Sequence, residues 1–309
     1  LAVHLVRPGG VIAFITPTGF LGGMYFRNLR ALMANDAPPT AIDFVSSRKG
    51  VFTDVLQETL LATYRRSAPK RPAAIHVTTL LSESEIEVEA TGVFSMSEVA
   101  YDPWLIPRYV SQASLIDRLR QMPHRLSDYG YQVSTGPLVW NRHKSQLSDT
   151  KGPGAYPIVW AESITRDGKF NYRTDKKNHR RFLRLMAGDE WLVTRRPCVI
   201  VQRTTAKEQH RRLIAAELPA EFIERYGAVS VENHLNMVRP SAPNPKISLM
   251  LLAAVFNSRI VDEVFRCMSG SVAVSASELE ALPLPPPEAL HRVEQLLTEG
   301  APASEIDAA

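Results

Sequence analysis

The stretch Val6-Arg-Pro-Gly-Gly-Val-Ile-Ala-Phe-Ile-Thr-Pro-Thr-Gly-Phe20 decides the fold. A Pro-Gly-Gly turn leads into an apolar run that ends at Pro17. Strands that are covered on both faces lose the polar alternation of half-exposed strands, so this run predicts a buried parallel strand. Such a strand belongs inside a sheet whose other strands precede it, and little sequence precedes this one. We therefore expect the chain to be the back part of a larger α/β protein.

The following segments predict the rest of that sheet. Met24 to Ala34 carries apolar residues at helical spacing, and the short apolar runs Ala41 to Val45 and Glu58 to Tyr64 predict two strands. The order strand, helix, strand, strand is typical of the end of a doubly wound sheet, with the last two strands paired as an antiparallel edge hairpin. The Pro- and Lys-containing break from Ser67 to Pro72 predicts that the chain leaves the sheet there.

The chain changes character from Leu126 onward. Short apolar pieces alternate with basic loops that bear Gly and Asn, which predicts a domain of strands and loops. Lys246 to Met268 is the strongest helical pattern, with a break expected near Asn257-Ser258. Ser275 to Ala281 predicts a shorter helix, and the residues after Gly300 are expected to be frayed.

Composition narrows the class of protein. With 309 residues, 45% hydrophobic and 22% charged, the chain resembles a soluble globular protein with room for two cores. We expect no membrane partner and a cytoplasmic location, because no stretch approaches the ~20 apolar residues of a membrane span. The two cysteines, Cys198 and Cys267, lack metal-ligand spacing, so no zinc site or disulfide framework is expected. Cys198 lies in an apolar run and is expected to be buried.

No catalytic or metal-binding motif is visible. Gly19, Gly22 and Gly23 lie between a strand and a helix, but their spacing matches neither the Rossmann nor the Walker loop, so we expect a plain turn. The eight histidines form no His-Glu-x-x-His motif, and the serines form no nucleophile elbow. We therefore assign no catalytic residue and no metal ligand.

Positive charge is concentrated in one block. Asn141 to Arg212 holds 17 Lys and Arg against 7 Asp and Glu, a net +10 in a chain whose total is +4. Such a block indicates a polyanion partner, and a solvated charged face is the alternative. Aromatic and amide side chains lie among the charges, which favours DNA, because Lys and Arg neutralise phosphates while Asn, Gln and Arg read base edges. The candidate DNA-binding residues are Trp140, Asn141, Arg142, Lys144, Lys169, Arg173, Lys176, Lys177, Arg180, Arg195, Arg196, Arg203, Thr204 and Thr205.

The first segment resembles the TaqI-like, gamma-class adenine-specific DNA methyltransferases of restriction-modification systems. In that family a Pro-Gly-Gly turn leads into an apolar strand ending in Pro, as Val6 to Pro17 does. A helix with paired arginines follows, as at Arg27 and Arg30, then a Val-Phe pair, as at Val51-Phe52, and a last strand like Glu58 to Tyr64.

The second half resembles the target recognition domain of the same family. Thr135-Gly136 to Lys144, Tyr156 to Glu162, Lys177-Asn178-His179 and Val199 to Thr205 fall in the expected order. The resemblance adds four candidate DNA-binding residues, Asn233, His234, Ser269 and Ser271. The succession of Asn-Ser, Gly-Ser and Leu-Pro-x-Pro also recurs in type I restriction specificity subunits. A non-catalytic DNA specificity module that serves a partner is therefore the alternative.

The resemblance implies an α/β fold in which the C-terminal part of an S-adenosylmethionine-dependent methyltransferase sheet precedes a mixed α+β target recognition domain. The expected domains are residues 1–67 for the sheet, 68–125 for a connecting region, 126–300 for target recognition and 301–309 for a frayed tail. The family stacks a flipped adenine on an aromatic ring beyond the hairpin, for which Phe94 and Trp104 are the candidates.

The resemblance also implies what is missing. The family binds S-adenosylmethionine through a Gly-rich loop and holds the adenine amine with Asn-Pro-Pro-Tyr, and here Asn244-Pro245 is followed by Lys246. We expect a site-specific DNA adenine N6-methyltransferase whose C-terminal fragment is inactive alone and binds no S-adenosylmethionine. The expected partners are double-stranded DNA, the missing N-terminal part and a cognate restriction endonuclease.

Overall fold

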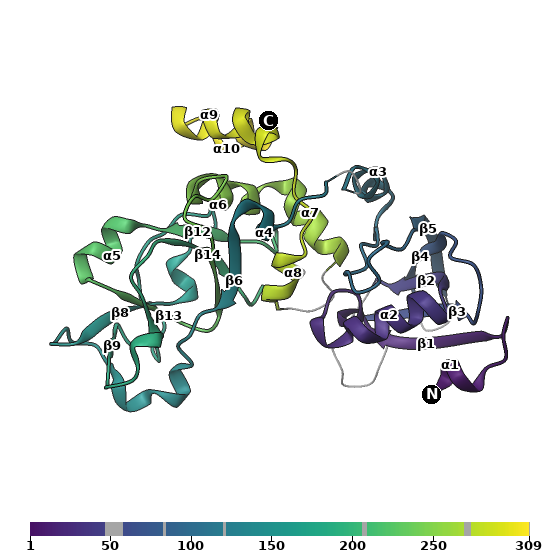
Figure 1. Cartoon of the computed structure of the whole chain (residues 1–309), viewed down its shortest axis with the longest axis horizontal. Coiled ribbons are helices and arrows are strands. Elements are labelled where there is room, and N and C mark those ends of the chain that lie inside the picture. Colours follow the sequence, from purple (N-terminus) through teal and green to yellow (C-terminus); the bar gives the residue numbers. More distant parts are fainter. Residues whose placement is uncertain (47–57, 83–84, 120–121, 206–208, 269–272, 309) are drawn as a thin grey trace. The chain divides into compact units, whose positions relative to one another are not determined.

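The computed structural model describes residues 1–46, 58–82, 85–119, 122–205, 209–268 and 273–308 (Figure 1). It divides into two compact units. Unit 1 comprises Leu1–Met122 with Glu263–Ser271, and unit 2 comprises Pro123–Asp262 with Val272–Ala309. No helix in the described ranges combines the length and the apolar character that a membrane span requires.

Unit 1 is built on one five-stranded sheet with the strand order β1-β3-β2-β4-β5. The expected runs form strands, and β2 pairs antiparallel with β3 as expected. This pair lies inside the sheet rather than at its edge, because β1 covers the other side of β3. The elements are α1 (Ala2–Leu5), β1 (Val11–Pro17), η1 (Thr18–Phe20), η2 (Met24–Phe26), α2 (Arg27–Asp36), β2 (Pro39–Val45), β3 (Thr59–Arg65), β4 (Ala73–Leu80), β5 (Ile86–Phe94) and α3 (Val110–Leu119).

The prediction of a buried parallel strand at the start of the chain is wrong for this structure. Among the described strands β1 pairs only with β3, and the pairing is antiparallel. Ile12 is buried, whereas Val11, Phe14 and Ile15 are exposed. The apolar pattern predicts that other elements cover both faces of the strand, and the exposed side chains show that they do not. In addition, the backbone edge of β1 opposite β3 has no partner strand within the described chain. The result is an apolar strand at the edge of the sheet.

The expected exit from the sheet at Ser67 to Pro72 is also wrong. That segment is only a loop, and β4 after it pairs parallel with β2 while β5 pairs antiparallel with β4. Ala73 and Ile75 are fully buried in the core of unit 1. A surface crossover between two strands has the same Pro- and Lys-containing composition as an exit, so the sequence did not separate the two.

Unit 2 contains two sheets, with strand orders β10-β13-β8-β9-β7 and β12-β11-β14-β6. Their facing sides share one core, to which the first sheet gives Val159 and Val231 and the second gives Ile200 and Met237. The strands are β6 (Tyr131–Thr135), β7 (Leu147–Ser148), β8 (Ala155–Val159), β9 (Phe182–Arg184), β10 (Val193–Thr194), β11 (Cys198–Gln202), β12 (Ala215–Leu218), β13 (Val229–Val231) and β14 (Leu235–Pro240).

Helices cover the ends of these sheets. The expected break at Asn257-Ser258 is confirmed, since α6 (Leu249–Asn257) ends at an extended Ser258 and α7 (Arg259–Met268) begins after it. The 275–281 helix is confirmed as α8 (Ala276–Glu280), which Ser275 caps. The remaining elements are α4 (Leu126–Tyr129), α5 (Ala220–Tyr226), α9 (His291–Glu299), α10 (Ala303–Ala308) and the single turns η3 (Trp140–Arg142), η4 (Lys144–Gln146), η5 (Ala161–Ser163), η6 (Glu190–Leu192) and η7 (Pro287–Leu290).

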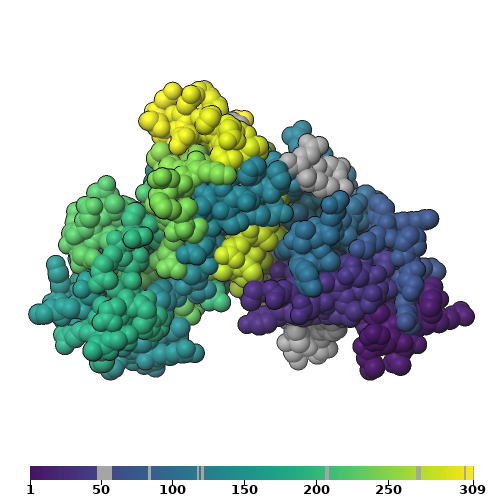
Figure 2. Space-filling view, in the orientation of Figure 1, coloured from purple at the N-terminus to yellow at the C-terminus, as the bar shows by residue number. Residues whose placement is uncertain are grey.

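The segment after Gly300 is helical rather than frayed. α10 packs against α9, and α9 packs against α6; both terminal helices appear in yellow in the space-filling view (Figure 2). The carboxylate of Asp307 accepts from the backbone N–H of Arg259 at 3.2 Å and pairs with Arg211 at 3.6 Å. These contacts fix a tail that sequence position alone suggested was loose.

Candidate nucleic-acid interface

Two segments far apart in the sequence meet where β6 ends. A Cβ atom added to Gly136 would lie 2.3 Å from the carbonyl oxygen of Glu232, so only glycine lets the two backbones approach. The Gly136 N–H donates to Leu235 O at 2.8 Å, and the Asn233 N–H donates to Leu138 O at 3.0 Å. This contact places the segment that carries Trp140 beside the Asn233-His234 turn.

The end of β11 joins the same turn. The backbone N–H of Arg203 donates to His234 O at 2.8 Å, and its guanidinium donates to Asn233 O at 3.0 Å. The Nδ1 of His234 lies 2.8 Å from the buried Glu232 carboxylate, which also accepts from the His234 backbone N–H. His234 itself keeps a side chain that is 55% exposed. Three sequence-predicted residues, Arg203, Asn233 and His234, therefore gather at one surface.

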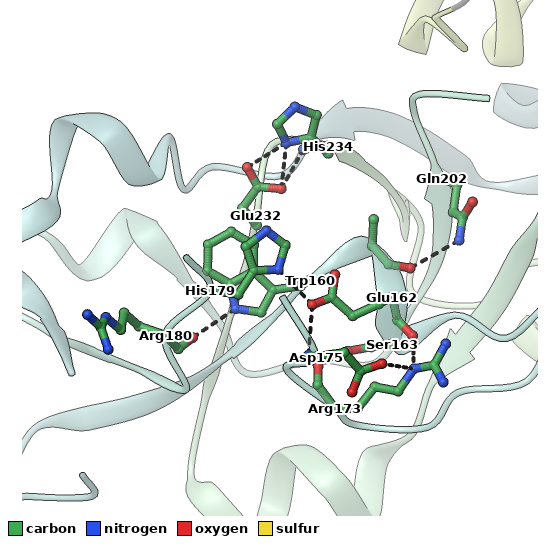
Figure 3. Close-up of polar contacts among 11 residues, drawn as sticks. Trp160, Glu162, Ser163, Arg173, Asp175, His179, Arg180, Gln202, Glu232 and His234 are labelled. Atoms are coloured by element: carbon green, nitrogen blue, oxygen red, sulfur yellow. Dashed lines mark hydrogen bonds and ion pairs between the residues drawn. The ribbon is translucent and has the colours of Figure 1, made fainter. Parts of the chain in front are cut away.

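A stacked pair of rings lies beside this turn (Figure 3). The imidazole of His179 lies on the indole of Trp160, with centroids 3.7 Å apart and planes 11° apart. The Nδ1 of His179 is 2.6 Å from Glu162 Oε1, and both side chains are largely buried. The second oxygen, Glu162 Oε2, is buried and makes no hydrogen bond within the described residues. Trp160 sits directly after β8, whose Val159 carbonyl accepts from the Glu232 N–H.

The stacked pair holds a basic loop, residues 176–181. The indole N–H of Trp160 donates to Arg180 O at 2.8 Å, and the Tyr172 hydroxyl donates to Arg181 O at 2.8 Å. The side chains of Lys176 and Lys177 are exposed and form no ion pair within the described part of the chain. These two hydrogen bonds fix the backbone of the loop, while the ammonium groups of Lys176 and Lys177 face solvent. Exposed ammonium groups on an ordered backbone suit phosphate binding.

Other predicted cations already have partners. Arg180 pairs with Asp149, Lys169 pairs with Asp167 at 3.4 Å, and Arg173 contacts Asp175 at 3.2 Å. Arg173 also donates to the Glu162 carbonyl at 2.6 Å. Since these pairs are exposed and weak, phosphates can compete for Arg180 and Lys169. Arg142, Asn141, Arg195, Arg196 and Thr204 are exposed, and Lys144 lies 5.7 Å over the half-buried ring of Trp140.

Three candidate DNA-contacting residues lie in the core and not at the surface. Thr205 is fully buried, and its hydroxyl donates to Arg212 O at 2.8 Å, so it cannot reach DNA. Phe94 and Trp104 are 3% and 2% exposed, with centroids 5.2 Å apart, and Trp104 also meets Phe20 edge-on. Neither ring offers an open face to a flipped base in this structure. Ser269, Ser271 and the Val51-Phe52 pair lie outside the described residues.

Sequence reasoning missed the roles of Trp160, Glu162 and His179. These residues fell within segments that the resemblance covered, but nothing in their spacing showed that the two rings stack. The sequence signal was an aromatic residue at a strand end followed by an acidic residue, with a histidine inside a basic run. Pairing them requires the loop to fold back over β8, which is tertiary information.

Metal ligands and reactive thiols are two kinds of group that can serve in catalysis. No group of three His, Cys, Asp or Glu side chains within the described residues is placed to hold a metal ion. Burial raises the pKa of both Cys198 and Cys267 to about 12, so neither thiol is a nucleophile at neutral pH. The predicted burial of Cys198 is confirmed.

The glycine turn of unit 1 is a structural turn. The guanidinium of the buried Arg30 donates to Phe20 O at 2.9 Å and to Gly23 O at 2.8 Å. A turn whose carbonyls face a cation is not a cradle for the anionic or carboxylate groups of a nucleotide-like cofactor. This observation agrees with the plain turn expected from the spacing.

Comparison with known proteins gives the relatives of the chain. No family model matches it. The chain is 26% identical over 294 residues to the type II methyltransferase M.BsuBI of Bacillus subtilis and 28% identical over 306 residues to the type II methyltransferase M.PstI of Providencia stuartii. These alignments cover 92% and 95% of this chain but 57% and 59% of the relatives, so the chain spans less than two thirds of their length.

Among solved structures, the type IIL restriction-modification enzyme MmeI, determined in complex with DNA, is similar with a TM-score of 0.51. The match covers 96% of this chain and 43% of MmeI at 10% identity, so it concerns the fold alone. The α/β fold class expected from the sequence is confirmed. Along nearly its whole length, this chain is similar to type II methyltransferases of restriction-modification systems.

Proposed function

We propose that this chain is the carboxy-terminal part of a site-specific DNA adenine N6-methyltransferase of a restriction-modification system. The observation that carries the proposal is the similarity to M.BsuBI and M.PstI, which extends over more than nine tenths of the chain and through both units. Adenine as the target base rests on the resemblance of the Val6 to Pro17 segment to the gamma class.

Unit 1 would complete a methyltransferase sheet. Its strand β1 has apolar side chains on both faces and a backbone edge without a partner in the described chain. An uncovered apolar edge of this kind is a pairing surface for further strands. The missing part would supply the S-adenosylmethionine site and the group that polarises the adenine amine. We expect the chain's own residues to do neither; in the glycine turn, Arg30 already bonds the carbonyls of Phe20 and Gly23.

Unit 2 would hold double-stranded DNA and select its sequence. The exposed Lys176 and Lys177 would contact phosphates, while Arg203, Asn233 and His234 would lie nearer the base edges. The remaining exposed candidates, Asn141, Arg142, Lys144, Arg195, Arg196 and Thr204, would extend this surface. A non-catalytic specificity module is the weaker alternative, since it has no use for the five-stranded sheet of unit 1. In a restriction-modification system the corresponding partner is a cognate endonuclease.

The genomic sequence upstream of Leu1 provides the test. We expect it to encode a Gly-rich cofactor loop and Asn-Pro-Pro-Tyr in frame. The extended protein should transfer methyl groups from S-adenosylmethionine to DNA and yield N6-methyladenine on nucleoside digestion, whereas the 309-residue chain should bind DNA without methylating it. An upstream region without either motif would contradict the enzyme proposal, and methylated cytosine would contradict the adenine assignment.

A further inference from the structure

Trp191 is a large aromatic side chain that unit 2 turns outward. It lies in η6, where the next residue, Leu192, is fully buried in the core with Trp160 and Leu183. Trp191 itself is 60% exposed. An indole offers a large apolar face, and leaving it in water forgoes the free energy of burying it. The exposed face of an indole is one on which a flat ligand ring can stack.

The position of Trp191 is fixed by its neighbours. The ring of His143 meets it at 67°, with centroids 6.3 Å apart, and His143 Nδ1 lies 2.7 Å from Gln146 Oε1. The buried Gln146 amide then donates to Arg184 O at 3.1 Å and to Asp189 Oδ2 at 2.6 Å. These bonds tie the segment of His143 to the segment that precedes Trp191. The indole is therefore presented by a bonded framework and does not wait for a ligand to order it.

Basic residues flank His143, the residue whose ring meets Trp191. We define the aromatic-basic patch as Trp140, Arg142, His143, Lys144 and Trp191. The Lys144 ammonium lies 5.7 Å from the centroid of Trp140, and Arg142 is exposed without an ion pair in the described ranges. The patch belongs to the 141–212 block with its net +10. Exposed aromatic and cationic side chains in one segment match a polyanion whose units carry flat rings.

We propose that the aromatic-basic patch is a base-stacking site: Trp191 stacks on an unpaired nucleobase that lies outside the base stack of DNA bound to unit 2, and Lys144 and Arg142 contact the adjoining phosphates. This inference rests on the proposed DNA-binding function of unit 2. Every base has a π-face, so the contact adds affinity with little choice among bases. The sequence pattern named Trp140, Arg142 and Lys144 as DNA-binding residues but did not single out Trp191.

The test compares Trp191→Ala, Trp191→Phe and Met186→Ala, each in the full chain, binding a labelled mixed-sequence duplex that contains unpaired bases. Met186 is the matched control, because it is 55% exposed and precedes Trp191 on the same loop. Loss of one stacking contact should weaken binding by about 5-fold to 100-fold for Trp191→Ala. Trp191→Phe should retain most of the affinity and Met186→Ala all of it. The salt dependence should stay the same in all three, since none of these side chains neutralises a phosphate.

Fluorescence supplies the readout that a purely structural role would not move. The emission of Trp191, taken as the difference between the wild-type chain and Trp191→Phe, should be quenched by saturating amounts of the duplex that contains unpaired bases. Unchanged emission at saturation would overturn the stacking site while leaving DNA binding intact. If the wild-type chain itself showed no salt-sensitive DNA binding, that result would instead contradict the function proposed for unit 2. Self-association that Trp191→Ala abolishes, with no effect of DNA, would show that a second copy covers the patch and would also overturn the proposal.

Discussion

The imidazole of His179 lies flat on the indole of Trp160, 3.7 Å between centroids, while its Nδ1 contacts the carboxylate of Glu162 at 2.6 Å. His179, in the middle of a basic run, is thus held by the ring of Trp160 and by the carboxylate of Glu162. The consequence is a basic loop with a fixed backbone, because Trp160 also bonds the carbonyl of Arg180.

Replacing His179 should destabilise unit 2. His179→Ala removes the ring stack and a partner of the largely buried Glu162, so the free energy of unfolding should fall by about 1–3 kcal/mol. Urea denaturation measures the change. His291→Ala is the control, since His291 is exposed and should shift stability by less than about 0.5 kcal/mol. Equal effects of the two substitutions would mean that the stack carries no energy.

Removing the two loop lysines should change the salt dependence of DNA binding. If Lys176 and Lys177 each neutralise one phosphate, the double alanine variant should lower the slope of log affinity against log salt by about 1.8. Filter binding across a salt series measures the slope. Lys70→Ala, an exposed lysine in unit 1, should leave it unchanged. The same slope in the wild type and the double variant would remove these lysines from the interface.

Gly136→Ala should be strongly destabilising. The new Cβ would lie 2.3 Å from the Glu232 carbonyl oxygen, and backbone cannot yield as a side chain tip can. We expect a loss of about 1–3 kcal/mol, the range for overpacked sites, together with weaker DNA binding. Gly152→Ala is the matched control, because its Cβ would meet only Arg184 Nη2 at 3.6 Å. Thermal unfolding of the two variants should therefore separate clearly, and coincident curves would contradict the close approach.

Arg30→Met should destabilise unit 1. The buried guanidinium donates to the carbonyls of Phe20 and Gly23, and also to Tyr101 O and Asp102 O at 3.2 Å each. Four backbone carbonyls, reached by one buried and three partly buried hydrogen bonds, would lose a charged donor at once, so we expect a loss of at least about 3 kcal/mol. Arg27→Met, on the exposed face of the same helix, should be nearly neutral. A small effect at Arg30 would show that water replaces its bonds.

Both thiols should resist modification in the folded chain. Burial raises the pKa of Cys198 and Cys267 to about 12, so the reactive thiolate is scarce up to about pH 9. An aromatic disulfide reagent at pH 8 should label neither residue until denaturant is added. Stoichiometric labelling of the folded chain would contradict the burial of these residues.

Local patterns predicted the elements well. The break between α6 and α7 was visible because a polar Asn257-Ser258 pair interrupts an apolar helical repeat, and the end of the 275–281 helix was visible because the Pro283 to Pro287 cluster follows it. Strand order was not visible, because the run after the Ser67 to Pro72 loop joins the sheet only through its pairing with β2.

The candidate site divides in the same way. Residue type alone identified a basic, aromatic-bearing half and named most of its exposed cations. The structure then showed that the candidates Thr205, Phe94 and Trp104 are buried. It also showed that Arg180, Lys169 and Arg173 already form ion pairs with aspartates. No local pattern reports which side of a loop faces the core.

The sequence by itself determined several helices and strands of this protein, among them the first three strands, the break at Asn257-Ser258 and the concentration of charge between residues 141 and 212, because each depends on neighbours along the chain. Only the tertiary structure decided that β1 lies at an edge, that His179 lies on Trp160, that Gly136 meets Glu232 and that Trp191 faces solvent. Those features depend on contacts between segments remote in sequence. Which residues bury or pair is a property of the packed chain.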